Sequence, residues 1–209
     1  MQAEGGASLS RSDADGHPDR RPLGLFVAVA LTAYLLDLGT KVLAVARLED
    51  RPPVHVIGDF LQLNLVRNPG AAVSTGPSST VLLSLVAVSA VAVVLFLSRR
   101  LNDRLWAVGL GCLLGGVLGN LTDRVFRAPG FMRGHVVDFL MLPNWPVFNV
   151  ADICINVAAG VIILQAVRGV SHTGHRHAGR KDEAKDEVGA DAQTEAEHDA
   201  RDDAGSGLA

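Results

Sequence analysis

Cysteine is scarce in this chain of 209 residues, which contains only Cys112 and Cys154. Both lie inside apolar segments, and neither belongs to a Cys-x-x-Cys pair or to a spacing of cysteine and histidine typical of zinc sites. A disulfide framework, a zinc site and a catalytic thiol are therefore not expected. Both side chains are interpreted as small apolar packing groups.

The first twenty residues contain no apolar run, so they do not form a secretory signal peptide. The first apolar segment follows them, is longer than a signal core, and is interpreted as an uncleaved signal anchor. At the other end, the chain after about Ser171 is rich in Asp, Glu, Ala, Gly and His, with almost no large apolar side chain to bury. Such a composition predicts a disordered tail. Loose metal binding is an alternative for its histidines, which are His172, His175, His177 and His198.

Hydrophobic residues make up 48% of the chain and are gathered in blocks, with a mean hydropathy of +0.27. Four blocks are long enough to cross about 30 Å of hydrocarbon as helices. They run over about 22–46, 80–97, 105–121 and 149–167. The third is rich in glycine, and small residues at that density allow helices to approach closely in a bilayer.

Basic residues predict the orientation of these helices. They lie before the first helix, between the second and third, and after the fourth: Arg20, Arg21, Arg99, Arg100, Arg104 and Arg168. These ends are expected in the cytoplasm, which places both termini inside. Arg124, Arg127 and Arg133 oppose this orientation. An even number of helices nevertheless keeps the termini on one side, and the inner clusters lie closer to the helix ends.

The outer segments are then about 47–79 and 122–148. Apolar and polar residues alternate from His55 to Val66, which favours short strands over a helix. The predicted fold is a membrane all-α core of four transmembrane helices, with a small extracytoplasmic β-cradle and disordered tails. Its expected divisions are a cytoplasmic tail over 1–21, a membrane domain over 22–168 and a charged cytoplasmic tail over 169–209.

Polar residues converge on the outer level of this topology from several segments. They are Asp37, Lys41, Asn68, Gly70, Asn120, Asp123, Arg124, Asp138, Asn149 and Asp152. Each has a structural explanation as well as a functional one: Asp37 and Lys41, four residues apart, form an ion pair on one helix face. Asn68 and Gly70 form a turn, and Asp123 and Arg124 close the third helix. Asn149 caps the fourth helix, whose dipole stabilises Asp152.

Asp138 and Asp152 are the strongest functional candidates, because a carboxylate at bilayer depth is costly. Asp138 is expected in the short loop that leads to the fourth helix. Two adjacent carboxylates share a proton, so one can activate water while its protonated partner polarises a carbonyl group. This chemistry needs no metal. A nucleophilic Ser74 or Ser78 with Lys41 is the competing arrangement, but no spacing supports it and Asp37 already engages Lys41.

Five blocks of residues, in order, resemble the motifs of the lipoprotein signal peptidases (signal peptidase II), membrane aspartic peptidases of bacteria. The blocks are Asp37–Lys41, Asn68–Ala72, Gly115–Arg124, Gly134–Phe139 and Phe148–Asp152. Two departures are Leu38, where the family often has Gln, and Val73, where it often has Phe. They affect only fine contacts around the lipid and signal peptide.

The resemblance implies that Asp138 and Asp152 are the catalytic dyad. It implies that Asn68, Gly70, Asn120, Arg124 and Asn149 line or brace the site, with Asp37, Lys41 and Asp123 in support. The implied substrate is a prolipoprotein whose cysteine carries diacylglycerol, cleaved just before that cysteine, and the implied inhibitor is globomycin. A monomer in the bacterial cell membrane is expected, in contact with lipid and with no cofactor, metal or nucleic-acid partner.

One hypothesis follows for the third helix: its glycines leave room for the signal-peptide helix. Replacing Gly116 or Gly119 with leucine is then predicted to slow cleavage without unfolding the protein. Two other classes of function remain as alternatives. A proton-coupled carrier would use Asp37, Asp138 and Asp152 as a relay, although carriers usually show internal repeats and a polar path through both leaflets. A membrane scaffold gives no reason for the two aspartates.

Overall fold

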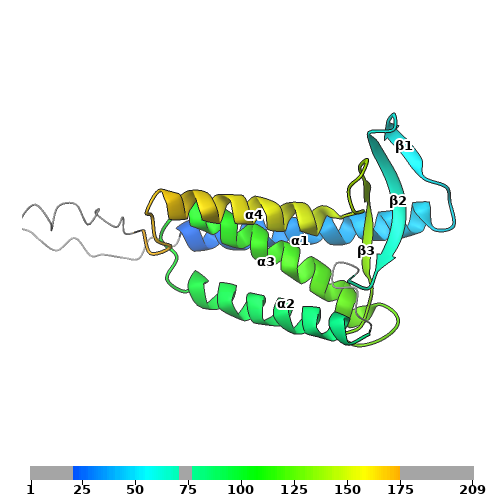
Figure 1. Cartoon of the computed structure of the whole chain (residues 1–209). Coiled ribbons are helices and arrows are strands. Elements are labelled where there is room, and N and C mark those ends of the chain that lie inside the picture. The colour runs from blue at the N-terminus through cyan, green and yellow to red at the C-terminus, as the bar shows by residue number, and fades with distance from the viewer. Residues whose placement is uncertain (1–20, 71–76, 175–209) are drawn as a thin grey trace, which may run out of the picture.

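The computed structural model describes residues 21–70 and 77–174, which form four helices and three strands (Figure 1). In chain order these are α1 (Arg21–Leu48), β1 (Val54–Ile57), β2 (Leu61–Asn68), α2 (Pro77–Ser98), α3 (Arg104–Phe126), β3 (Val136–Met141) and α4 (Val150–Val167). The tails predicted to be disordered lie outside the described residues over 1–20 and 175–209. The predicted architecture of four apolar helices and a small sheet is confirmed within the described part.

All four helices are long and apolar enough to cross a membrane. Large apolar side chains remain exposed along them, including Leu35, Leu82, Phe96 and Ile163. In water such a surface would be unfavourable, whereas lipid tails are as apolar as these side chains. The exposed surface therefore agrees with helices whose outer faces contact lipid.

The third helix, α3, is the centre of the bundle and packs against α1, α2 and α4. Its glycines make this possible. A Cβ atom at Gly115 would lie 2.6 Å from the carbonyl oxygen of Ala30 on α1, and one at Gly116 would lie 2.6 Å from that of Ala151 on α4. Gly119 is likewise buried, against Asp37. The hypothesis that Gly116 and Gly119 leave room for a substrate helix is therefore wrong, because α4 and α1 already occupy that space.

The three strands form one antiparallel sheet in the order β1-β2-β3, which lies across one end of the helix bundle (Figure 1). The alternating segment predicted to form strands contains β1 and β2. β3 was not predicted, and the expectation that Asp138 lies in a loop is wrong: it lies in β3, opposite Val66 of β2. Val136, Val137, Asp138 and Phe139 are all buried, so the segment lacks the alternation by which a half-exposed strand is recognised.

The C-terminal end of α3 differs from the predicted one. α3 continues to Phe126, so Asp123 and Arg124 lie within it and do not close it. The chain beyond α4 also remains packed: the indole Nε1 of Trp106 donates to the carbonyl oxygen of Val170 at 2.9 Å, and the backbone N–H of Asn102 donates to that of His172 at 3.0 Å. The described structure therefore extends to Gly174, past the boundary predicted at residue 168.

Candidate active site

The start of α4 supplies the first carboxylate of the site. Asn149 is the N-cap: its side-chain oxygen accepts from the backbone N–H of Asp152 at 3.0 Å, and the Asp152 Oδ2 accepts from the backbone N–H of Asn149 at 3.2 Å. This reciprocal capping box fixes the Asp152 side chain at the positive end of the helix dipole. The predicted cap at Asn149 is confirmed. Capping leaves the second oxygen of Asp152, Oδ1, available to the site.

Asp138 supplies the second carboxylate from β3, and it is only 2% exposed. Its Oδ2 accepts from the Asn68 Nδ2 at 2.8 Å, and its Oδ1 accepts from the Asn149 Nδ2 at 2.6 Å. Burial raises the pKa of the Asp138 carboxyl from 3.8 to about 6. The two amide donors oppose this rise in pKa and the charge of Asp152 adds to it. Asp138 therefore holds its proton to a much higher pH than an exposed aspartate.

Gly70 contributes to the site through the backbone of the turn after β2. Its N–H donates to the Asn68 Oδ1 at 2.8 Å, which directs the Asn68 amide nitrogen towards Asp138. Gly70 has a φ of 107°, which residues with a side chain rarely adopt. The predicted turn at Asn68 and Gly70 thus orients a donor to the carboxylate, while Gly70 itself does not line the hollow.

Two asparagines join the two carboxylates. The Asn120 Nδ2 donates to the Asp152 Oδ1 at 3.0 Å, and the Asn149 Nδ2 donates both to the Asn120 Oδ1 at 3.1 Å and to Asp138. The Lys41 Nζ also donates to the Asn120 Oδ1, at 2.9 Å. Because an ammonium group has no acceptor, it holds the Asn120 oxygen on its side and leaves the amide nitrogen facing Asp152.

Lys41 is fully buried and pairs with two aspartates from different helices. Its Nζ lies 2.8 Å from the Asp37 Oδ2 and 3.0 Å from the Asp123 Oδ2. Asp37 also accepts from the backbone N–H of Ala151 at 2.8 Å, and Asp123 from that of Val137 at 3.1 Å. This ion cluster therefore binds α1 and α3 to the residues that flank both carboxylates of the site.

The remaining cations lie on the last turn of α3. Arg127 pairs with Asp123, so the cluster of Asp37, Lys41, Asp123 and Arg127 contains two charges of each sign. Arg124 is close enough to interact electrostatically with Asp138, Asp152 and Asp123. Its buried Nη1 has no hydrogen-bond partner among the residues that the structure describes. Arg124 is thus a buried cation near the carboxylate pair, with donor capacity that the described residues do not use.

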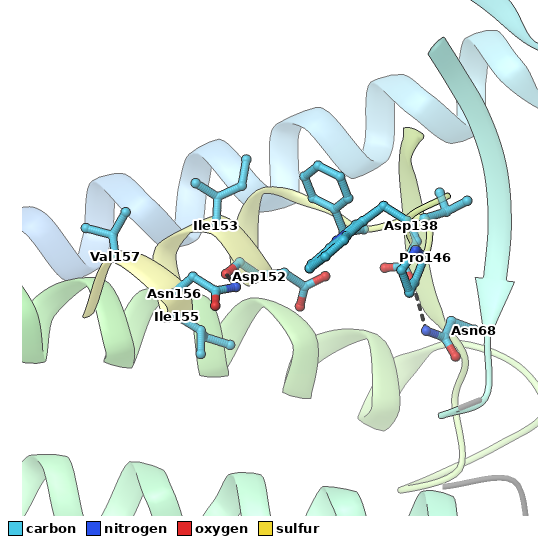
Figure 2. Close-up of a pocket in the computed structure, with 11 residues that line it drawn as sticks. Asn68, Asp138, Pro146, Asp152, Ile153, Ile155, Asn156 and Val157 are labelled. Atoms are coloured by element: carbon cyan, nitrogen blue, oxygen red, sulfur yellow. Dashed lines mark hydrogen bonds between the residues drawn. The ribbon is translucent and has the colours of Figure 1, made fainter. Parts of the chain in front are cut away.

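Both carboxylates line one hollow of about 480 Å³, and Figure 2 shows them directed into it. Its other walls are largely apolar and come from α4 and from the loop before α4. These lining residues are Trp145, Pro146, Val147, Phe148, Ile153, Ile155, Asn156 and Val157, with Asn68 at the sheet. The site therefore lies between the sheet, which carries Asn68 and Asp138, and the apolar first turns of α4.

Sequence reasoning missed Asn156 and the loop residues Trp145, Pro146 and Val147. Asn156 lies one turn after Asp152 and donates through Nδ2 to the backbone oxygen of that residue at 2.8 Å. A polar side chain inside an apolar helix is a signal that would have found it. Ser74 and the side chain of Ser78 lie outside the described part of the chain. In that part, no group of three or more His, Cys, Asp or Glu side chains is arranged to hold a metal ion.

A helical membrane protein with two carboxylates bridged by amides in an apolar hollow belongs to the class of membrane proteases. Within that class, residues 29–168 match the family model described as signal peptidase (SPase) II. The chain belongs to this signal peptidase II family, as the motifs in the sequence predicted.

The relatives agree with this assignment. The chain is 43% identical to the lipoprotein signal peptidase of Streptomyces griseus subsp. griseus, over 83% of this chain and 89% of that protein. It is 51% identical to the one of Rhodococcus jostii, over 75% and 79%. A solved structure described as a bacterial membrane enzyme matches with a TM-score of 0.63 and 23% identity, over 70% of this chain and 94% of that one. This last match concerns the fold.

Proposed function

We propose that this protein is an aspartic endopeptidase that removes signal peptides from prolipoproteins. Its substrate would carry a diacylglyceryl group on cysteine, and cleavage would occur at the peptide bond just before that cysteine. The observation that carries the proposal is the pair of carboxylates, Asp138 and Asp152, in one hollow beside an apolar helix face. A lipid-anchored peptide would enter such a hollow sideways from the bilayer.

In the proposed mechanism, Asp138 is the protonated partner and Asp152 is the base. Burial and the charge of Asp152 favour the proton on Asp138. Asp138 donates a hydrogen bond to the scissile carbonyl oxygen, and Asp152 takes a proton from the attacking water. The C–N bond then breaks as the amine of the lipidated cysteine receives a proton from the dyad. The free Nη1 of Arg124 is a further donor for the oxygen that becomes negative.

The proposed orientation places the sheet and the dyad at the extracytoplasmic face of the bacterial cell membrane, with both termini in the cytoplasm. Arg99, Arg100 and Arg104 between α2 and α3, and Arg168 after α4, support it, because they lie at the end of the bundle opposite the sheet (Figure 1). The membrane domain proposed over 22–168 acts as a monomer in contact with lipid, and residues 1–21 and 169–209 are cytoplasmic tails.

The test is cleavage of a diacylglyceryl-modified prolipoprotein by purified protein in detergent, followed by gel shift. We expect the wild type to cleave, globomycin to block cleavage, and Asp138→Asn and Asp152→Asn to be folded but inactive. Asp50→Asn is the matched control, because Asp50 is an exposed acid outside the hollow. A folded dyad variant with near-normal cleavage would refute the dyad assignment. An inactive wild type would refute the proposed function.

A further inference from the structure

A second hollow, of about 400 Å³, adjoins the hollow that contains the dyad. Trp145 and Val147 line both hollows, so the two are neighbours on either side of the loop before α4. The other walls of the second hollow come from Asp59 in the turn between β1 and β2, from Gln62, and from Met141 and the residues that follow it. These residues belong to the sheet and its connecting segments, and the sheet lies at one end of the bundle (Figure 1).

The two hollows extend from the dyad in different directions. The dyad hollow follows α4 past Asn156 and Val157, along a helix that is apolar enough to span the membrane. The outer hollow instead shares Trp145 with the dyad hollow and reaches the β1–β2 turn. A substrate cleaved at the dyad has two parts: an apolar signal peptide that stays in the bilayer, and a polypeptide that must leave it. The membrane side suits the first part and the outer hollow suits the second.

The outer hollow has a mostly apolar lining to which Asp59, Gln62 and Asn144 add polar groups, one of them acidic. Asp59 is 93% exposed and provides its negative charge, Gln62 and Asn144 provide amides, and no lysine or arginine lines it. Among the described residues, the ion-pair contact of Asp59 is with His55, whose Nδ1 lies 3.1 Å from the Asp59 Oδ1. An extended peptide has unpaired N–H and C=O groups that amides can bind, and an acidic wall attracts a basic side chain.

We propose that this outer hollow binds the residues that follow the lipidated cysteine of the substrate, and that Asp59 favours a basic side chain among them. The inference rests on the proposed function, since it assigns a part of the same substrate. It adds a specificity site outside the membrane span to the cleavage site. Asp59 acts on binding only and touches no reacting atom.

The experiment measures kcat and KM for three diacylglyceryl-modified prolipopeptides that differ only at the second to fourth residues after the cysteine. One carries lysine there, one glutamine and one glutamate. The enzymes are the wild type, Asp59→Asn, Asp59→Lys, Gln62→Lys and the control Asp50→Asn. Asp50 is an exposed acid that lines neither hollow; its φ is 56°, which asparagine accommodates.

We expect the wild type to prefer the lysine substrate over the glutamate one by about two- to fivefold in kcat/KM, because exposed charge pairs interact weakly. The difference should lie in KM and shrink at high salt. Asp59→Asn and Gln62→Lys should weaken the preference, Asp59→Lys should reverse it, and Asp50→Asn should keep it.

Several results would overturn this inference and leave the proposed function intact. They are equal cleavage of all three substrates by the wild type, an unchanged preference in Asp59→Lys, or the same loss of preference in Asp50→Asn as in Asp59→Asn. Each of these still requires cleavage by the wild type. If the wild type cleaved none of the three, the proposed function itself would fail, and with it this inference.

Discussion

Replacing Lys41 with methionine tests whether the buried ion cluster does more than hold the helices together. Lys41 has three partners within 3.0 Å: Asp37, Asp123 and Asn120. Methionine keeps the length and apolar stem of the side chain but removes the charge and all three donated bonds. The change therefore leaves two buried aspartates without their shared cation, and it leaves the Asn120 oxygen with the Asn149 amide as its remaining donor.

The expected loss of stability follows from the burial of the pair. Lys41 and Asp37 are both fully buried, and removing one partner of a buried ion pair lowers the free energy of unfolding by about 3–5 kcal/mol. The whole free energy of unfolding of a typical protein is only about 5–15 kcal/mol. Lys41→Met is therefore expected to lower the thermal midpoint in detergent substantially.

The double variant Asp37→Asn/Lys41→Met separates stability from activity. It removes one charge of each sign, and the asparagine oxygen at position 37 can still accept from the N–H of Ala151. Most of the lost stability should return. Activity should not return, because the Asn120 oxygen keeps only the neutral donor of Asn149 and lacks the ammonium group that holds it away from Asp152. A hydrogen bond to a charged group contributes about 1.5–3 kcal/mol, so kcat should stay reduced by about ten- to a hundredfold.

The assay combines thermal unfolding in detergent with kcat and KM for a diacylglyceryl-modified prolipopeptide. The decisive comparison is between the single and double variants. If the double variant regained both stability and wild-type kcat, Lys41 would be a structural cation only, and the argument that it orients Asn120 would be refuted. A single variant as stable as the wild type would refute the argument from buried charge.

Two further predictions concern pH and packing. The pKa of Asp138 is raised to about 6, so the folded state holds this proton more tightly than the unfolded state, and the free energy of unfolding should fall as pH rises from about 4 through about 6. The expected fall in the free energy of unfolding is about 3 kcal/mol, and it should be absent in Asp138→Asn. Cleavage should be lost above about pH 6. Cleavage that increases across this range would contradict the role of Asp138. Gly116→Ala should destabilise the protein by about 1–3 kcal/mol, because its Cβ would lie 2.6 Å from the carbonyl oxygen of Ala151. Gly160→Ala is the control: no atom lies within 4 Å of its Cβ, so the free energy of unfolding should hardly change. Equal unfolding temperatures for the two glycine variants would contradict this prediction, since α3 and α4 could then move apart at little cost to accommodate the methyl group.

The helices were predictable because each is a long apolar run, and β1 and β2 because their residues alternate. β3 was not predictable, because its residues are buried on both faces. Its partner strand β2 also lies some seventy positions earlier in the chain: Val66 pairs with Asp138, and Asn68 pairs with Val136. Long-range pairing of this kind leaves no periodic signal in a short segment.

The members of the site were predictable from their motifs, but their connections were not. The spacing of Asp37 and Lys41 indicated their ion pair, whereas nothing local indicated that Asp123 of α3 joins it. The same holds for Asn120, whose orientation depends on a cation from another helix. The two hollows depend on how the loop at Trp145 folds, and that loop carries no motif.

The spacing of charges within α1 and α3 has a consequence for how the protein is made. Each brings together an acid and a base four residues apart: Asp37 with Lys41 within α1, and Asp123 of α3 with its C-cap residue Arg127. A single charged residue at the centre of a helix opposes insertion by about 2.5–3.5 kcal/mol. A pair on one face can enter the bilayer as a neutral unit, so each helix can leave the insertion machinery during synthesis without waiting for its partner. The contact between Lys41 and Asp123 then forms afterwards, when α1 and α3 meet within the lipid with each of these charges already paired.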